Sequence, residues 1–166
     1  MFFVGVICEK QNFSILKRNI NKIKNKKEVT LININKKSIE NFKNVKFDAL
    51  VVNDSIQDFH NEVNTIKDIC KNIQYLIINS DIQIKEDIFS DIKANIITCG
   101  VNHKSTVTFS SVTDELLLIS VQRSFKDKKG KLIEVGEYNY KIKKSERTNL
   151  IEVLDGFIIT KLYDFD

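Results

Sequence analysis

The stretch Asn95–Phe125 reads NIITCGVNHKSTVTFSSVTDELLLISVQRSF. It begins with a short β-branched run that ends at Gly100, passes through a polar turn, and continues as two apolar runs joined by Thr113 and Asp114. A short continuous apolar run is typical of a strand buried on both faces, and runs joined by a tight turn are typical of antiparallel strands. The stretch therefore predicts the point at which a parallel sheet passes into an antiparallel extension.

Apolar runs alternate with amphipathic segments before this point. The expected strands are Phe2–Ile7, Val29–Ile34, Phe47–Asn53, Tyr75–Ser80 and Asn95–Gly100. The expected helices are Ser14–Ile23 with Ser14 as its cap, Asn61–Asn72, and Ile84–Ile92. This alternation predicts an α/β fold with three layers, in which helices cover both faces of a mostly parallel sheet of about five strands.

We expect one domain over residues 1–166, with a parallel α/β part in 1–100 and antiparallel strands and a C-terminal helix in 101–166. The run LIEVGEYNYKI alternates as a strand does, and Gly130 lies in the turn before it. The segment Glu146–Tyr163 has apolar residues at helical spacing, and Ser145 can cap it. A helix is favoured there, with a final strand at GFIIT as the alternative.

The composition predicts a buried core and argues against a nucleic-acid partner. The chain has 166 residues, 42% of them hydrophobic, which is enough for a buried core. It carries 26 Lys and Arg against 22 Asp and Glu, a net charge of +4 that is spread along the chain without a basic block. Heavy use of Lys, Asn and Ile is typical of AT-rich bacterial coding and raises the basic count. We therefore expect a solvated surface and no nucleic-acid partner.

The chain shows no signal for secretion or membrane insertion. The start, MFFVGVICEK, lacks a basic leader and a cleavage pattern, and no window approaches the ~18 apolar residues of a spanning helix. The three cysteines, Cys8, Cys70 and Cys99, are widely separated, so we expect them to be reduced and buried. A cytoplasmic location is predicted.

The junction after the first strand is where an α/β nucleotide-binding protein places its phosphate loop. Here the turn reads CEKQNFS over Cys8–Ser14 and has no glycine, since Gly5 lies inside the strand. Glu9 would repel a phosphate at this position. The sequence therefore predicts that a working phosphate loop is missing, and we expect no nucleotide or other cofactor.

Asp54 lies near the end of the third expected strand, where receiver domains carry the aspartate that accepts a phosphoryl group. The acidic pair expected after the first strand is reduced to Glu9, and Lys104 would have to supply the basic residue. A turn or helix-capping role is the alternative for Asp54. His60 and His103 have no second ligand at a diagnostic spacing, so we expect no metal site.

Four polar residues lie at or just after the carboxyl ends of the fourth and fifth expected strands: Asn79, Asp81, Asn102 and Lys104. Ligands of open α/β sheets settle outside the carboxyl ends of the strands, so these side chains would line a small-molecule pocket if one is present. Polar residues also populate such loops where nothing binds, which is the alternative.

The run YLIINSD at 75–81, followed by IITCGVNHKSTVTFSSV at 96–112, resembles the late part of the central domain of Mur ligases. These ATP-dependent enzymes add amino acids to peptidoglycan precursors. Asn79 and Asp81 match a family turn of the form Asn-x-Asp-Asp, with isoleucine in place of the second aspartate. Ile97–Gly100 matches a family strand of the form Ile-Thr-aromatic-Gly, with cysteine at the aromatic position. The likeness extends thinly over the rest of the chain.

Departures from this family decide the functional expectation. The resemblance implies a glycine-rich phosphate loop with a lysine and a threonine, and Cys8–Ser14 does not supply it. The Asp-His pair and the separate precursor-binding and amino-acid-binding domains are also missing. We therefore expect a non-catalytic domain that binds a protein partner or itself, linked by lineage to envelope or sporulation processes. The alternatives are a binder of nucleotides or peptidoglycan precursors and a degenerate receiver-like signalling domain.

Overall fold

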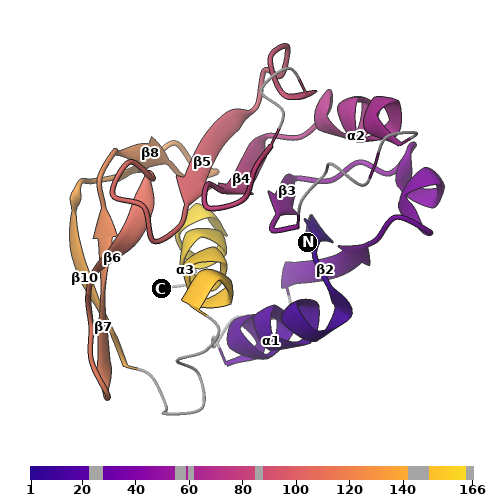
Figure 1. Cartoon of the computed structure of the whole chain (residues 1–166). Helices are drawn as coiled ribbons and strands as arrows, with labels where there is room; N and C mark the ends of the chain where they lie inside the picture. Colours follow the sequence, from indigo (N-terminus) through magenta and orange to yellow (C-terminus); the bar gives the residue numbers. More distant parts are fainter. Residues whose placement is uncertain (23–27, 55–58, 60–61, 85–87, 142–149, 164–166) are drawn as a thin grey trace.

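The computed structural model describes residues 1–22, 28–54, 59, 62–84, 88–141 and 150–163. Within these residues, eight strands form one sheet in the order β10-β7-β6-β5-β4-β3-β1-β2 (Figure 1). The strands are β1 (Phe2–Ile7), β2 (Val29–Ile34), β3 (Ala49–Val52), β4 (Tyr75–Asn79), β5 (Asn95–Cys99), β6 (Val107–Val112), β7 (Leu116–Val121) and β10 (Gly136–Lys141). The predicted α/β fold is confirmed.

The sheet changes from parallel to antiparallel where the sequence predicts it. β1 pairs in parallel with β2 and β3, and the parallel pairing continues through β4 and β5. β6 joins β5 in parallel at the pair Cys99 and Val107, and its pairing with β7 is antiparallel, as is that of β7 with β10. The antiparallel extension therefore continues the same sheet.

Helices cover both faces of the sheet. α1 (Lys10–Asn21) and α3 (Leu150–Tyr163) share one hydrophobic core with the sheet. η2 (Ile39–Phe42) and α2 (Val63–Cys70) share the core on the opposite face. Figure 1 shows α3 lying between the antiparallel strands and α1. None of the described helices has the length and apolar character needed to cross a bilayer.

α3 is buried on nearly all sides. Its second half contributes Phe157, Ile158, Ile159, Leu162 and Tyr163 to the core, so successive residues are buried and not only those of one stripe. A helix that is apolar all round is typical of a position inside a fold. Here α3 packs on α1 and on β5 and β6. The alternative of a final strand at GFIIT is therefore wrong.

The helices differ from the prediction in several places. α1 begins at Lys10, and Ser14 lies inside it, where its hydroxyl donates to the Lys10 carbonyl at 2.9 Å and caps nothing. In the expected helix Ile84–Ile92, residues 85–87 lie outside the described residues, and the described remainder forms no α-helix. Ser145 also lies outside them, and the described helix starts at Leu150.

A small hairpin closes the amino-terminal edge of the sheet. β8 (Phe125–Lys126) and β9 (Leu132–Ile133) pair as a second sheet, and Gly130 takes a positive φ of 85° in their turn, as the sequence predicts. The Tyr75 hydroxyl donates to the Lys126 carbonyl at 3.1 Å. The Lys128 backbone N–H donates to the last turn of α3 at Leu162, at 3.0 Å. The hairpin therefore ties α3 to the strands.

Candidate functional site

The strand order reverses at β1, which has β2 on one side and β3 on the other. α1 follows β1 on one face of the sheet, and η2 follows β2 on the opposite face. The loops on either side of such a reversal diverge, and open α/β sheets bind ligands in the crevice that this leaves at the carboxyl ends of the strands. The carboxyl ends of β1, β2 and β3 are therefore the first place to look for a site.

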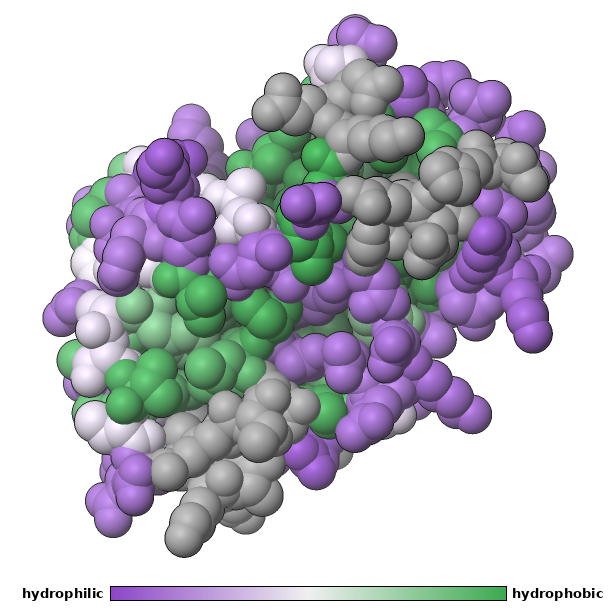
Figure 2. Space-filling view, in the orientation of Figure 1, coloured by the Kyte–Doolittle hydropathy of each residue, from purple (hydrophilic) through white to green (hydrophobic). Residues whose placement is uncertain are grey.

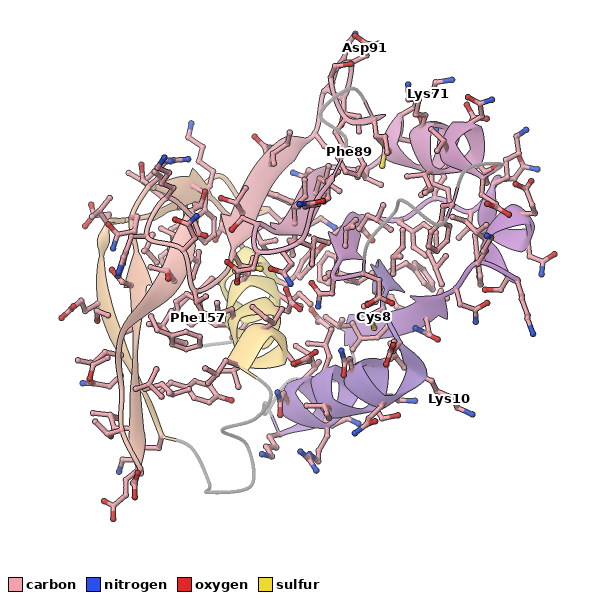
Figure 3. All side chains as sticks on the ribbon, in the orientation of Figure 1. Cys8, Lys10, Lys71, Phe89, Asp91 and Phe157 are labelled. Carbon is pink, nitrogen blue, oxygen red and sulfur yellow. The ribbon has the colours of Figure 1, made fainter. Side chains whose placement is uncertain are left out.

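A pocket of about 580 Å³ lies at this position. The turn after β1 contributes Cys8, Glu9 and Lys10, of which Cys8 and Lys10 are labelled in Figure 3. The segments after β2 and β3 contribute further lining residues, including Lys36 and Asp54. A pocket of this size is within the range that holds small molecules. We call it the switch-point pocket.

Two carboxylates stand where α1 begins. Asp54 is joined to β1 through its backbone N–H, which donates to the Ile7 carbonyl at 3.3 Å. Burial raises the pKa of Asp54, and the charge of Glu9 raises it further, while a hydrogen bond with the Glu9 backbone acts in the opposite direction. Because both acidic residues lie beside the start of α1, their negative charge complements the positive end of that helix.

The β1–α1 turn is built without glycine. Glu9 holds the N-cap position with an extended ψ of 148°, and its carbonyl accepts from the Phe13 backbone at 3.0 Å. Gly5 lies inside β1, where a Cβ would come within 2.8 Å of the Ile34 side chain. This glycine is therefore explained by core packing. The turn offers no glycine-lined cradle of the kind that holds a phosphate.

Asn33 fixes the wall of the pocket on the β2 side. Its amide nitrogen donates to the Cys8 carbonyl at 3.0 Å and lies 3.8 Å from the Cys8 sulfur. Burial raises the pKa of the Cys8 thiol to about 12, and the nearby Asp54 charge contributes to the rise. A thiol with such a pKa stays protonated, and Cys8 packs as a buried thiol in the pocket wall.

A buried polar cluster lies behind this edge of the sheet. Asp155 of α3 is fully buried and accepts hydrogen bonds from the Asn53 amide and, at 3.5 Å, from the Cys99 thiol. Burial raises the pKa of Asp155 to about 7, although both hydrogen bonds lower it. Burial also raises the pKa of Glu152, one turn earlier in α3. The sequence interpretation missed these acids, although acidic residues inside an otherwise apolar helix are the signal for them.

The four predicted site residues form two turns. Asn79 is buried, and its side-chain oxygen accepts from the Asp81 backbone at 3.0 Å. Asp81 in turn accepts from the Val101 backbone at 2.8 Å, which joins the β4 and β5 exits. The Asn102 side chain accepts from the Lys104 backbone at 2.9 Å. None of the four lines the switch-point pocket, and a ligand role for them stays a prediction.

The described residues hold no group of three or more metal-ligating side chains that could bind a metal ion. His103 is exposed in the turn after β5, and His60 lies outside the described residues.

Fold and site together define a doubly wound α/β domain with an antiparallel extension and a pocket at the switch point. No protein-family model matches the chain, and no curated protein sequence matches it. The resemblance of Tyr75–Val112 to Mur ligases therefore stays an expectation from the sequence.

Proposed function

We propose that this chain is a non-catalytic domain that binds a small molecule in the switch-point pocket. The observation that carries the proposal is the position of this pocket. It lies at the carboxyl ends of three parallel strands where their order reverses, which is where open α/β sheets hold their ligands. Chain segments from all three strand exits contribute to it, so the fold itself holds the lining groups in place.

The charges around the pocket favour a ligand with hydrogen-bond donors over a phosphate. Glu9 and Asp54 stand at the start of α1, where a phosphate would otherwise bind, and they would repel it. The same carboxylates favour an ammonium or hydroxyl group. Lys10 and Lys36 line the pocket as well and match acceptor groups elsewhere on the ligand. An amino sugar or an amino acid has this combination, and the Mur-like motifs favour a fragment of a peptidoglycan precursor.

The absence of catalysis is supported by the same turn. Acyl-phosphate chemistry needs a phosphate cradle, a metal ion and a closing domain. The β1–α1 turn has no glycine, and the described residues form no cluster that could hold a metal. Measurable ATP hydrolysis that is lost on substitution within Glu9–Ser14 would contradict a non-catalytic role.

Thermal shift with matched ligands tests the proposal. Glucosamine and N-acetylglucosamine differ in the ammonium group, so at millimolar concentration we expect glucosamine to raise Tm and N-acetylglucosamine to have a smaller effect. Asp54→Asn should abolish the difference, whereas Asp91→Asn, at an exposed position remote from the pocket (Figure 3), should keep it. A shift with ATP and Mg²⁺ but with neither sugar would overturn the proposal.

A receiver-like role is a second candidate, because one specific observation favours it. The parallel strands have the order 2-1-3-4-5, which doubly wound receiver domains share, and Asp54 follows β3. Lys104 does not line the pocket that Asp54 lines, and the lysines of that pocket are Lys10 and Lys36. Incubation with acetyl phosphate and Mg²⁺, followed by intact mass measurement, distinguishes this role. A phosphoryl adduct that Asp54→Asn removes would support it.

Protein binding and self-association stay predictions from the sequence. The exposed large apolar side chains of the described residues come from separate segments, among them Phe3, Ile96, Val112 and Val135. Size-exclusion chromatography with light scattering measures the oligomeric state directly. A monomer at all accessible concentrations would remove self-association.

A further inference from the structure

A second pocket, of about 440 Å³, lies between β10, α1 and α3. It is formed on the face of the sheet that α1 and α3 cover, and it shares no lining residue with the switch-point pocket. Figure 2 shows hydrophobic side chains gathered between the antiparallel strands and α3. Neither the proposed function nor the sequence motifs account for it. We call it the β10–α3 pocket.

Aromatic rings form one wall of the β10–α3 pocket. Tyr138 and Tyr140 alternate with exposed residues along β10 and therefore point to the same face. Phe157 projects from α3 toward the antiparallel strands (Figure 3), and its ring lies 5.2 Å from that of Tyr138 at an angle of 57°. Because the two rings are tilted, a planar ligand can stack on the face of one ring and meet the edge of the other.

Gly156 opens the side of α3 that lines the pocket. A glycine within a helix is unfavourable relative to alanine, so its position needs a reason. Close packing against α1 does not supply one, because a Cβ here would meet Asn19 at 3.7 Å and Leu16 at 4.0 Å, which are ordinary contact distances. The missing side chain instead leaves space in the pocket.

Asn19 brings an unused acceptor to the pocket. The side chain is only 5% exposed, and its amide nitrogen donates to the Glu152 carbonyl at 3.4 Å. Its side-chain oxygen, which is buried, has no hydrogen-bond partner among the described residues. Buried polar groups are satisfied in nearly all folded proteins, so an orphaned oxygen in a pocket wall points to a donor on a ligand.

The charge at the pocket is positive. Lys22, Lys141 and Lys161 line it, and no acidic side chain among the described residues does. The Lys161 ammonium lies 5.1 Å from the centre of the Tyr138 ring and 5.8 Å from that of Phe157, so it stands above the aromatic wall. An anionic group on a stacked ligand would meet this ammonium.

We propose that the β10–α3 pocket binds a planar heteroaromatic anion that carries a ring N–H. Its ring stacks on Tyr138 and meets the edge of Phe157, beside the open side of Gly156. The ring N–H donates to the Asn19 side-chain oxygen, and the anionic group pairs with Lys161. Each group of the ligand thus matches one feature of the pocket: the aromatic wall, the Asn19 side-chain oxygen or the Lys161 ammonium.

Three related probes separate these contributions: orotate, uracil, which lacks the carboxylate, and 1,3-dimethylorotate, which lacks both ring N–H groups. We expect orotate to bind with a Kd below about 1 mM and each of the other two at least about tenfold more weakly, since one charged or buried hydrogen bond is lost. The readout is a titration followed by backbone and side-chain amide NMR shifts. Shifts should concentrate at Asn19, at Tyr138–Lys141 and at Gly156–Lys161.

Three variants keep the test independent of folding. Gly156→Ala should weaken orotate binding at least about tenfold while raising the midpoint of urea unfolding, a pair of effects that a damaged fold cannot give. Lys161→Met should remove the preference for orotate over uracil. Gly136→Ala, in β10 but with open space around it, should leave binding unchanged. No binding of orotate to the folded chain, or equal binding of all three probes, would overturn the proposal, whatever the switch-point pocket binds.

Discussion

Asp155 in α3 accepts a hydrogen bond from the side-chain amide of Asn53 at the end of β3, 102 residues earlier in the chain. The second oxygen of Asp155 accepts from the Cys99 thiol at the end of β5. One fully buried carboxyl group therefore bridges two strand ends that have β4 between them. The last helix is therefore joined to the carboxyl ends of β3 and β5.

The free energy of unfolding should fall as the pH rises, because of the buried carboxyl group of Asp155. Its pKa is raised from 3.8 to about 7 by burial. Between these two values the unfolded chain is ionised while the folded chain keeps its proton, so folding takes up a proton. The free energy of unfolding should then fall by up to about 1.4 kcal/mol per pH unit between about pH 4 and pH 7. Urea unfolding at several pH values, followed by circular dichroism, measures this slope.

Asp155→Asn should reduce that slope, because the amide does not titrate. Part of the pH dependence should remain in this variant, because the pKa of Glu152 is also raised by burial. Asp91→Asn, at an exposed position, serves as the control and should keep the slope of the parent chain. If Asp155→Asn and the parent chain show the same pH dependence, the buried carboxyl group is not the source.

Gly5→Ala should destabilise the fold by about 1–3 kcal/mol, the usual cost of overpacking a filled core. The added Cβ would lie 2.8 Å from the Ile34 side chain and 3.0 Å from that of Leu50, and both of these residues are fully buried. Gly136→Ala meets nothing within 4 Å and should be close to neutral or stabilising. Urea midpoints of the two variants give the comparison, and equal midpoints would contradict the packing account of Gly5.

Asp81→Ala should lower stability by about 1 kcal/mol, because the Val101 backbone N–H loses its carboxylate acceptor. Lys104→Ala should change stability little, since the side chain is exposed. Thermal unfolding of both variants measures the difference. A small-molecule ligand whose binding depends on both residues would instead support the pocket that the sequence predicts there.

The three cysteines should resist thiol reagents in the folded chain. All three are free and buried, and burial raises the pKa of Cys8 and of Cys70 to about 12. Cys99 is fully buried, and its thiol donates to Asp155. The three thiols should react slowly with an aromatic disulfide reagent in native buffer. In urea, all three should react completely. Rapid reaction of Cys8 under native conditions would show an accessible thiolate in the switch-point pocket.

Strands were predicted well because their signal is local. The bounds of β1 and β2 agree with the predicted ranges, and β4 and β5 differ by one residue at the end. Continuous β-branched runs leave few other places for a chain to be buried on both faces. Helix starts were predicted less well, because Ser14 is a good cap in isolation, yet the tertiary structure begins α1 at Lys10.

The candidate sites depend on contacts between distant segments, which no local pattern reveals. The polar residues that the sequence interpretation named lie at or after the ends of β4 and β5, where they bond to one another in turns. The interpretation did not predict the switch-point pocket at the carboxyl ends of β1, β2 and β3, because the position of that pocket depends on the strand order. The orphaned oxygen of Asn19 and the open side of Gly156 likewise follow from the docking of α3 on α1.

Backbone amide shifts of the β1–α1 turn report most directly on what the switch-point pocket binds. In a titration of the isotope-labelled chain, glucosamine should move the signals of Cys8, Glu9, Lys10 and Asp54, and ATP with Mg²⁺ should leave them in place. Movement of these signals by ATP and Mg²⁺ alone, with no response to the amine, would contradict a donor-bearing ligand at this edge of the sheet.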